Sequence, residues 1–249
     1  MDTDRLSNAA ADPAQTQHLN LGNAEALLNP TSASDRTKVA LIEAALQAFT
    51  KNGYAATSTR EIASLAEANI AAISYHFGGK EGLRDACSVF IVAVMRQALI
   101  QHLHGYMEEL TTSTPEEAEK QLLQQLERMV FFVLLDPKAR LFVRFLIMEM
   151  ASPSAVVDHV YSNLIEPAHK AICQLFARAS GWGAEEERTR LAVFTFVGQI
   201  FYFRMTQDVI LQRLDWESLT PVEAKKLATA VTFNLRATLA LARSEAEDD

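Results

Sequence analysis

Cysteine, tryptophan and glycine are scarce in this chain of 249 residues, which contains two, two and nine of them. Two cysteines are too few for a disulfide framework, and both Cys87 and Cys173 lie in apolar helical patterns that predict buried, reduced thiols. The histidines are equally dispersed. His102 and His104 are two positions apart and do not share a helix face. The sequence therefore predicts no metal site and no cofactor.

An excess of positive charge is also missing. Lys and Arg total 23 against 31 Asp and Glu, and the net charge is −8. Residues 34–85 contain six of each sign and are neutral, so residues before 34 carry −3 and residues after 85 carry −5. A generally basic nucleic-acid-binding surface is thereby excluded. Any contact with DNA must depend on a few positioned groups, with an acidic remainder that discourages non-specific association.

Long hydrophobic runs and catalytic motifs are absent as well. No apolar run reaches the roughly 18 residues needed to cross a bilayer. Asp2 and Asp4 make the N-terminus unlike a secretory signal. The chain has neither a GxSxG motif nor a glycine-rich phosphate loop. We therefore expect a cytoplasmic protein that makes no membrane contact and is not an enzyme.

What the chain does have is sustained helical periodicity. From residue 34 onward apolar residues recur at helical spacing, and no segment alternates as a strand does. We expect an all-α chain of about nine helices: a mobile tail over residues 1–33, a three-helix helix-turn-helix domain over residues 34–83 and a larger helical domain over residues 84–249. Caps and prolines place the helices of the larger domain at about 80–104, 114–135, 136–150, 152–180, 184–213 and 221–244. Pro167 should kink or split the fourth of these.

Residues 58–77 predict two short helices around a tight turn. Ile62, Ala63, Leu65 and Ala66 give the first helix an apolar side. The second helix has its own apolar side, formed by Ile70, Ile73 and Phe77.

The opposite side of that second helix consists of small or hydrogen-bonding residues, namely Ala71, Ala72 and Tyr75, flanked by Ser74 and His76. A helix enters the DNA major groove closely only when its outward side chains are small. The pattern therefore indicates a DNA recognition helix. Gly78 and Gly79 end it, and Lys80 begins the next helix, where free N–H groups favour a phosphate.

Residues 59–63, 68–77 and 78–83, in this order, resemble the DNA-binding domain of the TetR/AcrR family of bacterial regulators, most closely its CecR-like subgroup. The similarity is close over about residues 35–90 and loose elsewhere. It implies a ligand-responsive repressor that binds a palindromic operator as a homodimer. It also implies that helices 184–213 and 221–244 pair with their copies in a four-helix bundle.

One residue departs from the family pattern. Glu67 occupies the turn position where the family usually has glycine. A left-handed conformation at this position costs a non-glycine residue about 1 kcal/mol. We expect Glu67 to point away from DNA.

DNA contacts are expected from the recognition helix, from the start of the preceding helix and from the start of the following one. The residues are Thr59, Arg60, Asn69, Ala71, Ala72, Ser74, Tyr75, His76 and Lys80. Tyr75, Ser74 and His76 suit base edges or phosphates, whereas Asn69 should cap the recognition helix.

The larger domain should hold a small-molecule effector, which the sequence does not identify. Six residues in apolar runs are candidates for its site: Phe142, Phe145, Met148, Phe176, Phe201 and Arg204. Most aromatic residues in such runs belong to a core. Arg144 and Glu149 lie in the same kind of run and predict a structural ion pair.

Two other functions compete with this interpretation. An all-helical enzyme with a small-molecule pocket would use a residue such as His159 or Glu149 and would leave no DNA footprint. An adaptor that has lost sequence-specific DNA binding is favoured slightly by Glu67 and by the neutral charge of residues 34–85. The intact recognition-helix sequence argues against both.

Overall fold

The computed structural model describes residues 27–97, 113–151 and 155–248. Within these ranges every regular element is a helix, which confirms the all-α prediction. None of these helices is long and apolar enough to cross a membrane. The expected tail lies outside the described residues up to residue 26. Leu27 and Leu28, at its end, are helical and pack against the first core.

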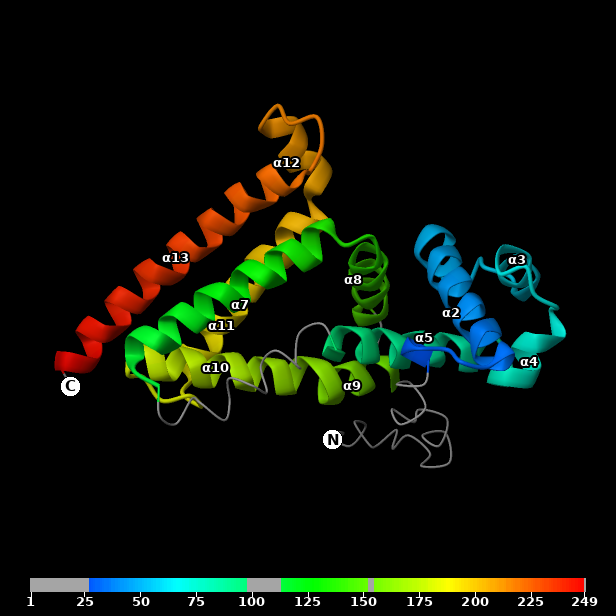
Figure 1. Cartoon of the computed structure of the whole chain (residues 1–249), viewed down its shortest axis with the longest axis horizontal. Coiled ribbons are helices and arrows are strands. Elements are labelled where there is room, and N and C mark those ends of the chain that lie inside the picture. The colour runs from blue at the N-terminus through cyan, green and yellow to red at the C-terminus, as the bar shows by residue number, and fades with distance from the viewer. Residues whose placement is uncertain (1–26, 98–112, 152–154, 249) are drawn as a thin grey trace, which may run out of the picture.

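Three helices form one end of the molecule: α2 (Ala33–Asn52), α3 (Thr59–Leu65) and α4 (Ala71–Phe77) (Figure 1). Ser32 begins α2, because its hydroxyl accepts the backbone N–H of Asp35 at 3.0 Å. Gly53, at a φ of 84°, ends it. Ile42, Leu46 and Phe49 are buried as the sequence pattern predicts.

Helix α5 (Lys80–Met95) leads from this end toward the middle of the molecule. There α8 (Pro137–Met150) packs on α2, and α9 (Ala155–Val160) packs on α5. One core joins these elements and includes Phe49, Phe90 and Phe142. The rings of Phe90 and Phe142 meet edge to face, with centroids 6.3 Å apart. The apolar core therefore continues across the expected domain boundary at residues 83–84.

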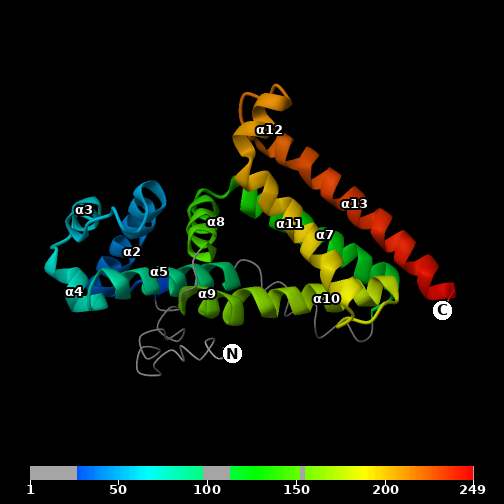
Figure 2. The ribbon, with the colours of Figure 1, turned by 180° about the vertical axis from the view of Figure 1, so that it is seen from behind.

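The other end is built from α7 (Pro115–Leu135), α10 (Glu166–Ser180), α11 (Glu187–Met205) and α13 (Pro221–Asp248), around a second core. Helix α13 lies along the outer edge and packs mainly on α7. The short α12 (Gln207–Arg213) projects from the top of this end, as both views show (Figures 1 and 2).

Local signals in the sequence explain most of the helix boundaries. Thr114 and Glu117 form a capping box at the start of α7, and Asp136 caps α8 by accepting two backbone N–H groups. The predicted ends at about residues 135, 150 and 180 agree with the structure. The predicted end of the helix from Lys80, at about 104, lies outside the described residues.

Two predicted helices are divided. The helix expected over 152–180 contains a π-helical segment, Tyr161–Ile165, directly before α10. Pro167 is the reason, because it has no N–H to donate to the carbonyl of Asn163. Arg96 Nη1 donates to that carbonyl instead, at 3.0 Å. The helix expected over 184–213 breaks at Thr206 into α11 and α12, and α13 continues past 244 to Asp248.

Candidate nucleic-acid interface and effector cavities

The helix-turn-helix is held to α2 by side-chain hydrogen bonds. Ser58 caps α3 by accepting the N–H of Glu61 at 3.1 Å, and the Glu61 carboxylate accepts from the amide of Asn52 at 2.8 Å. The buried Thr57 hydroxyl lies 2.8 Å from the carbonyl of Gly53. These bonds fix the start of α3 against the end of α2.

The backbone at Glu67, in the turn between α3 and α4, has the expected left-handed conformation. Its φ is +50°, and the N–H groups of Glu67 and Ala68 donate to the carbonyls of Ser64 and Ala63 at 3.2 and 2.9 Å. These two bonds form a Schellman motif, in which the left-handed position is usually glycine. Glu67 is exposed, and where its carboxylate lies relative to DNA stays a prediction.

Helix α4 presents a mixed outer surface. Tyr75 is 84% exposed, Ala71 and Ser74 are exposed, and Ile73 on the opposite side is buried. The Tyr75 ring meets that of His76 edge to face, with centroids 4.9 Å apart. This arrangement presents a phenol at the centre of the outer face.

Three expected orientations were wrong. Ala72 is half-buried and packs against the first core, so it does not belong to the outer face. Ile70 and Leu65, expected to point inward, are 47% and 53% exposed. Both flank the left-handed turn, where the chain leaves the ideal helical periodicity that the prediction assumed.

Asn69 caps α4 nearly as predicted. The helix begins formally after Ile70, which makes no side-chain cap bond, but the Asn69 side-chain oxygen accepts the N–H of Ala71 at 2.9 Å. Thr59 and Arg60 begin α3, with Arg60 exposed.

The step from α4 to α5 places Lys80 at a helix start, as predicted. Gly78 is left-handed at a φ of 73°, and α5 begins at Lys80. The Lys80 ammonium lies 4.4 Å from the centroid of the Tyr54 ring. Sequence reasoning missed Gly82: a Cβ there would lie 1.8 Å from the carbonyl oxygen of Phe77, so glycine lets α4 and α5 meet. A glycine inside the first turn of a predicted helix was the available signal.

The predicted ion pair between Arg144 and Glu149 is wrong. Glu149 is buried and accepts two hydrogen bonds from Arg84 Nε, at 2.9 and 3.0 Å, and a further one from Arg84 Nη2. Hydrogen bonding to Glu149 raises the pKa of Arg84. The Arg84 guanidinium also lies 4.7 Å from the centroid of the Tyr54 ring. Glu149, which was expected to pair within α8, thus connects α8 to α5 through Arg84, a residue 65 positions away in the sequence.

The six expected effector residues do not form one pocket. Phe142 and Phe145 are buried in the first core, and Phe176 is buried in the second, with Phe201 packed against it. Aromatic side chains in an amphipathic pattern pack into a core whether or not a ligand is bound, so a role of these residues in effector binding stays a prediction. Met148 and Arg204 do line a common cleft.

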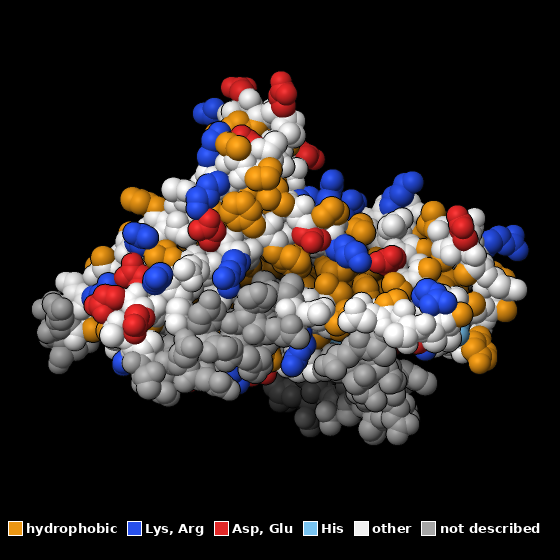
Figure 3. All heavy atoms as spheres, viewed as in Figure 1, with side chains coloured by type: hydrophobic (Ala, Val, Ile, Leu, Met, Phe, Trp, Pro, Cys, Tyr) orange, Lys and Arg blue, Asp and Glu red, His pale blue; other side chains and the backbone are white. Residues whose placement is uncertain are grey.

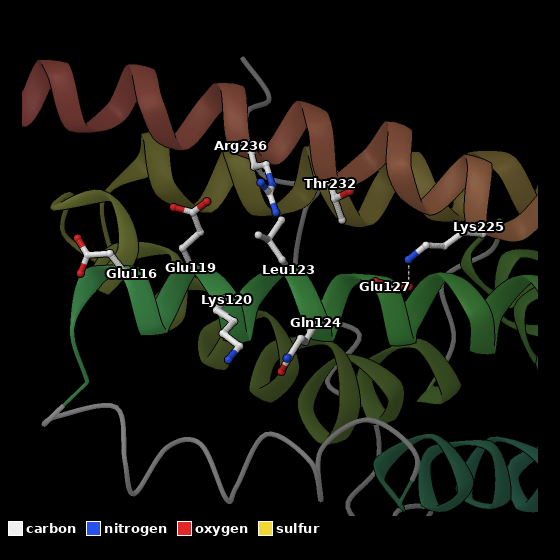
Figure 4. Close-up of a pocket in the computed structure, with 9 residues that line it drawn as sticks. All are labelled: Glu116, Glu119, Lys120, Leu123, Gln124, Glu127, Lys225, Thr232 and Arg236. Atoms are coloured by element: carbon white, nitrogen blue, oxygen red, sulfur yellow. Dashed lines mark hydrogen bonds and ion pairs between the residues drawn. The ribbon is translucent and has the colours of Figure 1, made fainter.

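A separate groove runs between α7 and α13 (Figure 4). Half of the charged residues that line it are paired, since Lys225 contacts Glu127 and Arg243 bonds Glu119 at 2.8 Å. Among the described residues, no group of three His, Cys, Asp or Glu side chains is placed to hold a metal ion.

Helices α11 and α13 expose large apolar side chains. Those on α11 include Leu191, Phe194, Tyr202 and Met205, each more than half exposed. On α13, Phe233 is 70% and Leu241 is 61% exposed. Leu227, Val231 and Leu235 of the same helix are buried.

Two family models match the chain. Residues 41–87 match the model for bacterial regulatory proteins of the tetR family, and residues 118–241 match the C-terminal domain of the HTH-type transcriptional dual regulator CecR. The CecR regulator of Shigella flexneri is 30% identical over 207 residues, which cover 82% of this chain and 92% of that protein. The regulator TtgR of Pseudomonas putida is 27% identical over 66% of this chain and 78% of its own length.

Solved structures share the fold. AibR, in a complex with isovaleryl coenzyme A and operator DNA, superposes with a TM-score of 0.59 at 14% identity, over 79% of this chain and 96% of that one. A transcriptional regulator from Pseudomonas aeruginosa gives a TM-score of 0.55 at 23% identity, over 80% and 90%. The helix-turn-helix geometry and these matches agree: the chain belongs to the tetR family and is a DNA-binding transcriptional regulator, not an enzyme.

Proposed function

We propose that the chain is a ligand-responsive repressor that binds a palindromic operator as a homodimer in the cytoplasm and is released when a small molecule occupies the domain after residue 84. The observation that carries the DNA-binding part is the outer face of α4. Tyr75 is 84% exposed there, above the buried Ile73 that anchors the helix. A phenol that is this exposed gains little from packing, and a major groove supplies partners for both its ring and its hydroxyl.

The other expected DNA contacts support α4 from its two sides. Arg60 and Thr59 begin α3, and Lys80 begins α5, so each lies at a helix N-terminus. Backbone N–H groups and the helix dipole favour phosphate at such positions. These residues would position the protein on the duplex, and Ser74, Tyr75 and His76 would meet base edges.

The homodimer is supported by the apolar surface of α11 and α13. Large exposed apolar side chains gathered on two helices that contact each other are typical of a protein interface. A two-fold interface there would place two recognition helices about one duplex turn apart, roughly 34–36 Å, as a palindrome requires.

DNase I footprinting on the region upstream of its own gene tests the DNA-binding part. Tyr75→Ala should weaken operator binding by about 1–3 kcal/mol and leave thermal stability unchanged, since the side chain of Tyr75 is 84% exposed. An operator affinity equal to that of the unaltered protein would contradict the assignment of Tyr75. Tyr161→Ala, at another exposed tyrosine far along the chain, is the matched control.

Sedimentation velocity tests the dimer. Phe233→Glu should convert the dimer to a monomer, because it places a charge in the centre of an apolar interface. Tyr161→Glu, outside α11 and α13, should leave the dimer intact. A Phe233→Glu protein that sediments as a dimer would contradict the proposed interface.

A further inference from the structure

Three arginines border a cleft between the DNA-binding end and the rest of the chain. Arg140 and Arg144 are four residues apart on one face of α8, and Arg204 lies near the end of α11. All three line two adjoining hollows of about 400 and 540 Å³. The second hollow also includes Lys51, at the end of α2. Lys and Arg side chains are visible along this edge, between the projecting α12 and α2 (Figure 3).

The cleft is electropositive, because the positive side chains that line it outnumber the carboxylates. Its four cations are accompanied by two carboxylates, Asp136 and Asp208, which leaves an excess of two positive charges. The Asp136 carboxylate already accepts two backbone N–H groups as the cap of α8. In the part of the chain that the structure describes, none of the ion pairs includes Arg140, Arg144 or Arg204.

Arg204 is partly buried and is held in place by a hydrogen bond to the backbone. Its Nη1 donates to the carbonyl of Leu134 at 3.1 Å, which fixes the guanidinium at the cleft. Burial, and next the charge of Arg140, lower the pKa of Arg204. Arg204 is partly buried beside the exposed Arg140 and Arg144, and an anion bound between the three would offset the repulsion of their like charges.

The other residues that line the cleft indicate which groups a ligand would carry besides its negative charge. Val143, Ile147, Met148 and Met205 give the first hollow an apolar wall. Gln207 lines both hollows, and its side-chain oxygen is buried without a hydrogen-bond partner among the described residues. A ligand that fits all three features has a multiply charged head, an apolar part and a hydrogen-bond donor.

We propose that this cleft binds an organic phosphate ester, with the phosphate between Arg140, Arg144 and Arg204 and the apolar part against Ile147, Met148 and Met205. Guanidinium groups match phosphate oxygens with paired, charge-assisted hydrogen bonds. A phosphate monoester carries two charges near neutral pH and neutralises the whole excess, whereas a monocarboxylate neutralises half of it. The inference rests on the proposed function, because it names the chemical class of the effector.

Isothermal titration calorimetry on the full chain tests the site with three probes: phenyl phosphate, inorganic phosphate and benzoate. Phenyl phosphate combines the double charge with an apolar ring, and each of the other probes has only one of these. We expect phenyl phosphate to bind at least about tenfold more tightly than either. Arg144→Met should weaken its binding by about tenfold or more, since each guanidinium makes charged hydrogen bonds to it.

Arg128→Met is the matched control, because Arg128 is an exposed arginine on α7 outside the cleft. It should bind phenyl phosphate as the unaltered protein does. Equal binding of phenyl phosphate and inorganic phosphate would mean an adventitious ion only and would overturn the proposal. Undetectable binding of phenyl phosphate, or binding that Arg144→Met leaves unchanged, would overturn it as well.

Operator binding separates this inference from the function on which it rests. Without ligand, Arg144→Met should bind the operator normally. Weaker operator binding by this variant would assign the arginines to the DNA backbone and overturn the effector site. An unaltered protein that gives no footprint would instead contradict the proposed function, and the calorimetric result would still decide whether the cleft binds phosphate esters.

Discussion

Replacing Glu67 by glycine should stabilise the protein. Glu67 is exposed and has a φ of +50° inside a Schellman motif, so its backbone is left-handed, while its side chain makes no hydrogen bond or ion pair among the described residues. A left-handed residue with a Cβ is less favourable than glycine by about 1 kcal/mol. For a chain of this size, about 1 kcal/mol corresponds to a rise in melting temperature of about 2–4 °C.

Chemical denaturation of three proteins separates backbone strain from charge: the unaltered chain, Glu67→Gly and Glu67→Ala. Glu67→Ala removes the carboxylate but keeps the Cβ, so its free energy of unfolding should match that of the unaltered chain. Operator affinity should be the same in all three if the carboxylate points away from DNA. A Glu67→Gly protein that is no more stable than Glu67→Ala would refute the assignment of strain to this turn. Tighter operator binding by both variants would refute the expected direction of the carboxylate.

Three further changes test packing and ionisation. Glu149→Gln should destabilise the fold by about 2 kcal/mol in urea denaturation, because Arg84 keeps its charge in a partly buried place. Glu43→Gln, in an exposed ion pair, should cost less than about 0.5 kcal/mol, and an equal loss in both variants would contradict the argument. Gly82→Ala should lower stability by about 2 kcal/mol or more in the same assay, because its Cβ would lie 1.8 Å from a backbone oxygen of α4; unchanged stability would show that the helices can separate without cost. Burial raises the pKa of Cys173 to about 11, so its thiol stays neutral at about pH 8 and should react with Ellman's reagent at least about tenfold more slowly in the folded chain than in urea; equal rates would show that it is accessible.

The helix boundaries could be predicted because they depend on neighbouring residues. A cap such as Asp136, or a capping box such as that of Thr114, acts over three or four residues, which the sequence displays directly. The left-handed conformation at Glu67 was predictable for another reason, namely the resemblance to a family that usually has glycine at this position. An interruption at Pro167 was also predicted, but its π-helical form was not, because Arg96, far away in the sequence, makes it tolerable by bonding the carbonyl of Asn163.

The grouping of the candidate effector residues could not be predicted, because periodicity reports burial and not what lies beside a buried group. Phe142 and Phe176 are both buried, yet they belong to different cores. The partner of Glu149 was missed in the same way. Arg144 is closer in sequence, but α8 turns it toward the cleft, whereas Arg84 of α5 faces the carboxylate.

Helix α8 is the element that relates the cleft to the DNA-binding end. It contains two of the cleft arginines, and its last turn contains Glu149, which bonds Arg84 in the second turn of α5. Helix α5 begins directly after the two glycines that end α4 and touches α4 at Gly82, where no side chain intervenes. A ligand held between Arg144 and Arg204 would fix α8 against α11, and the Glu149–Arg84 bonds would transmit any resulting displacement of α8 to α5. The ligand changes DNA affinity only to the extent that it binds one placement of α8 more tightly than another. Glu149→Gln should therefore reduce the effect of phenyl phosphate on operator affinity while leaving its binding to the cleft unchanged, which distinguishes a connecting residue from a ligand-binding one.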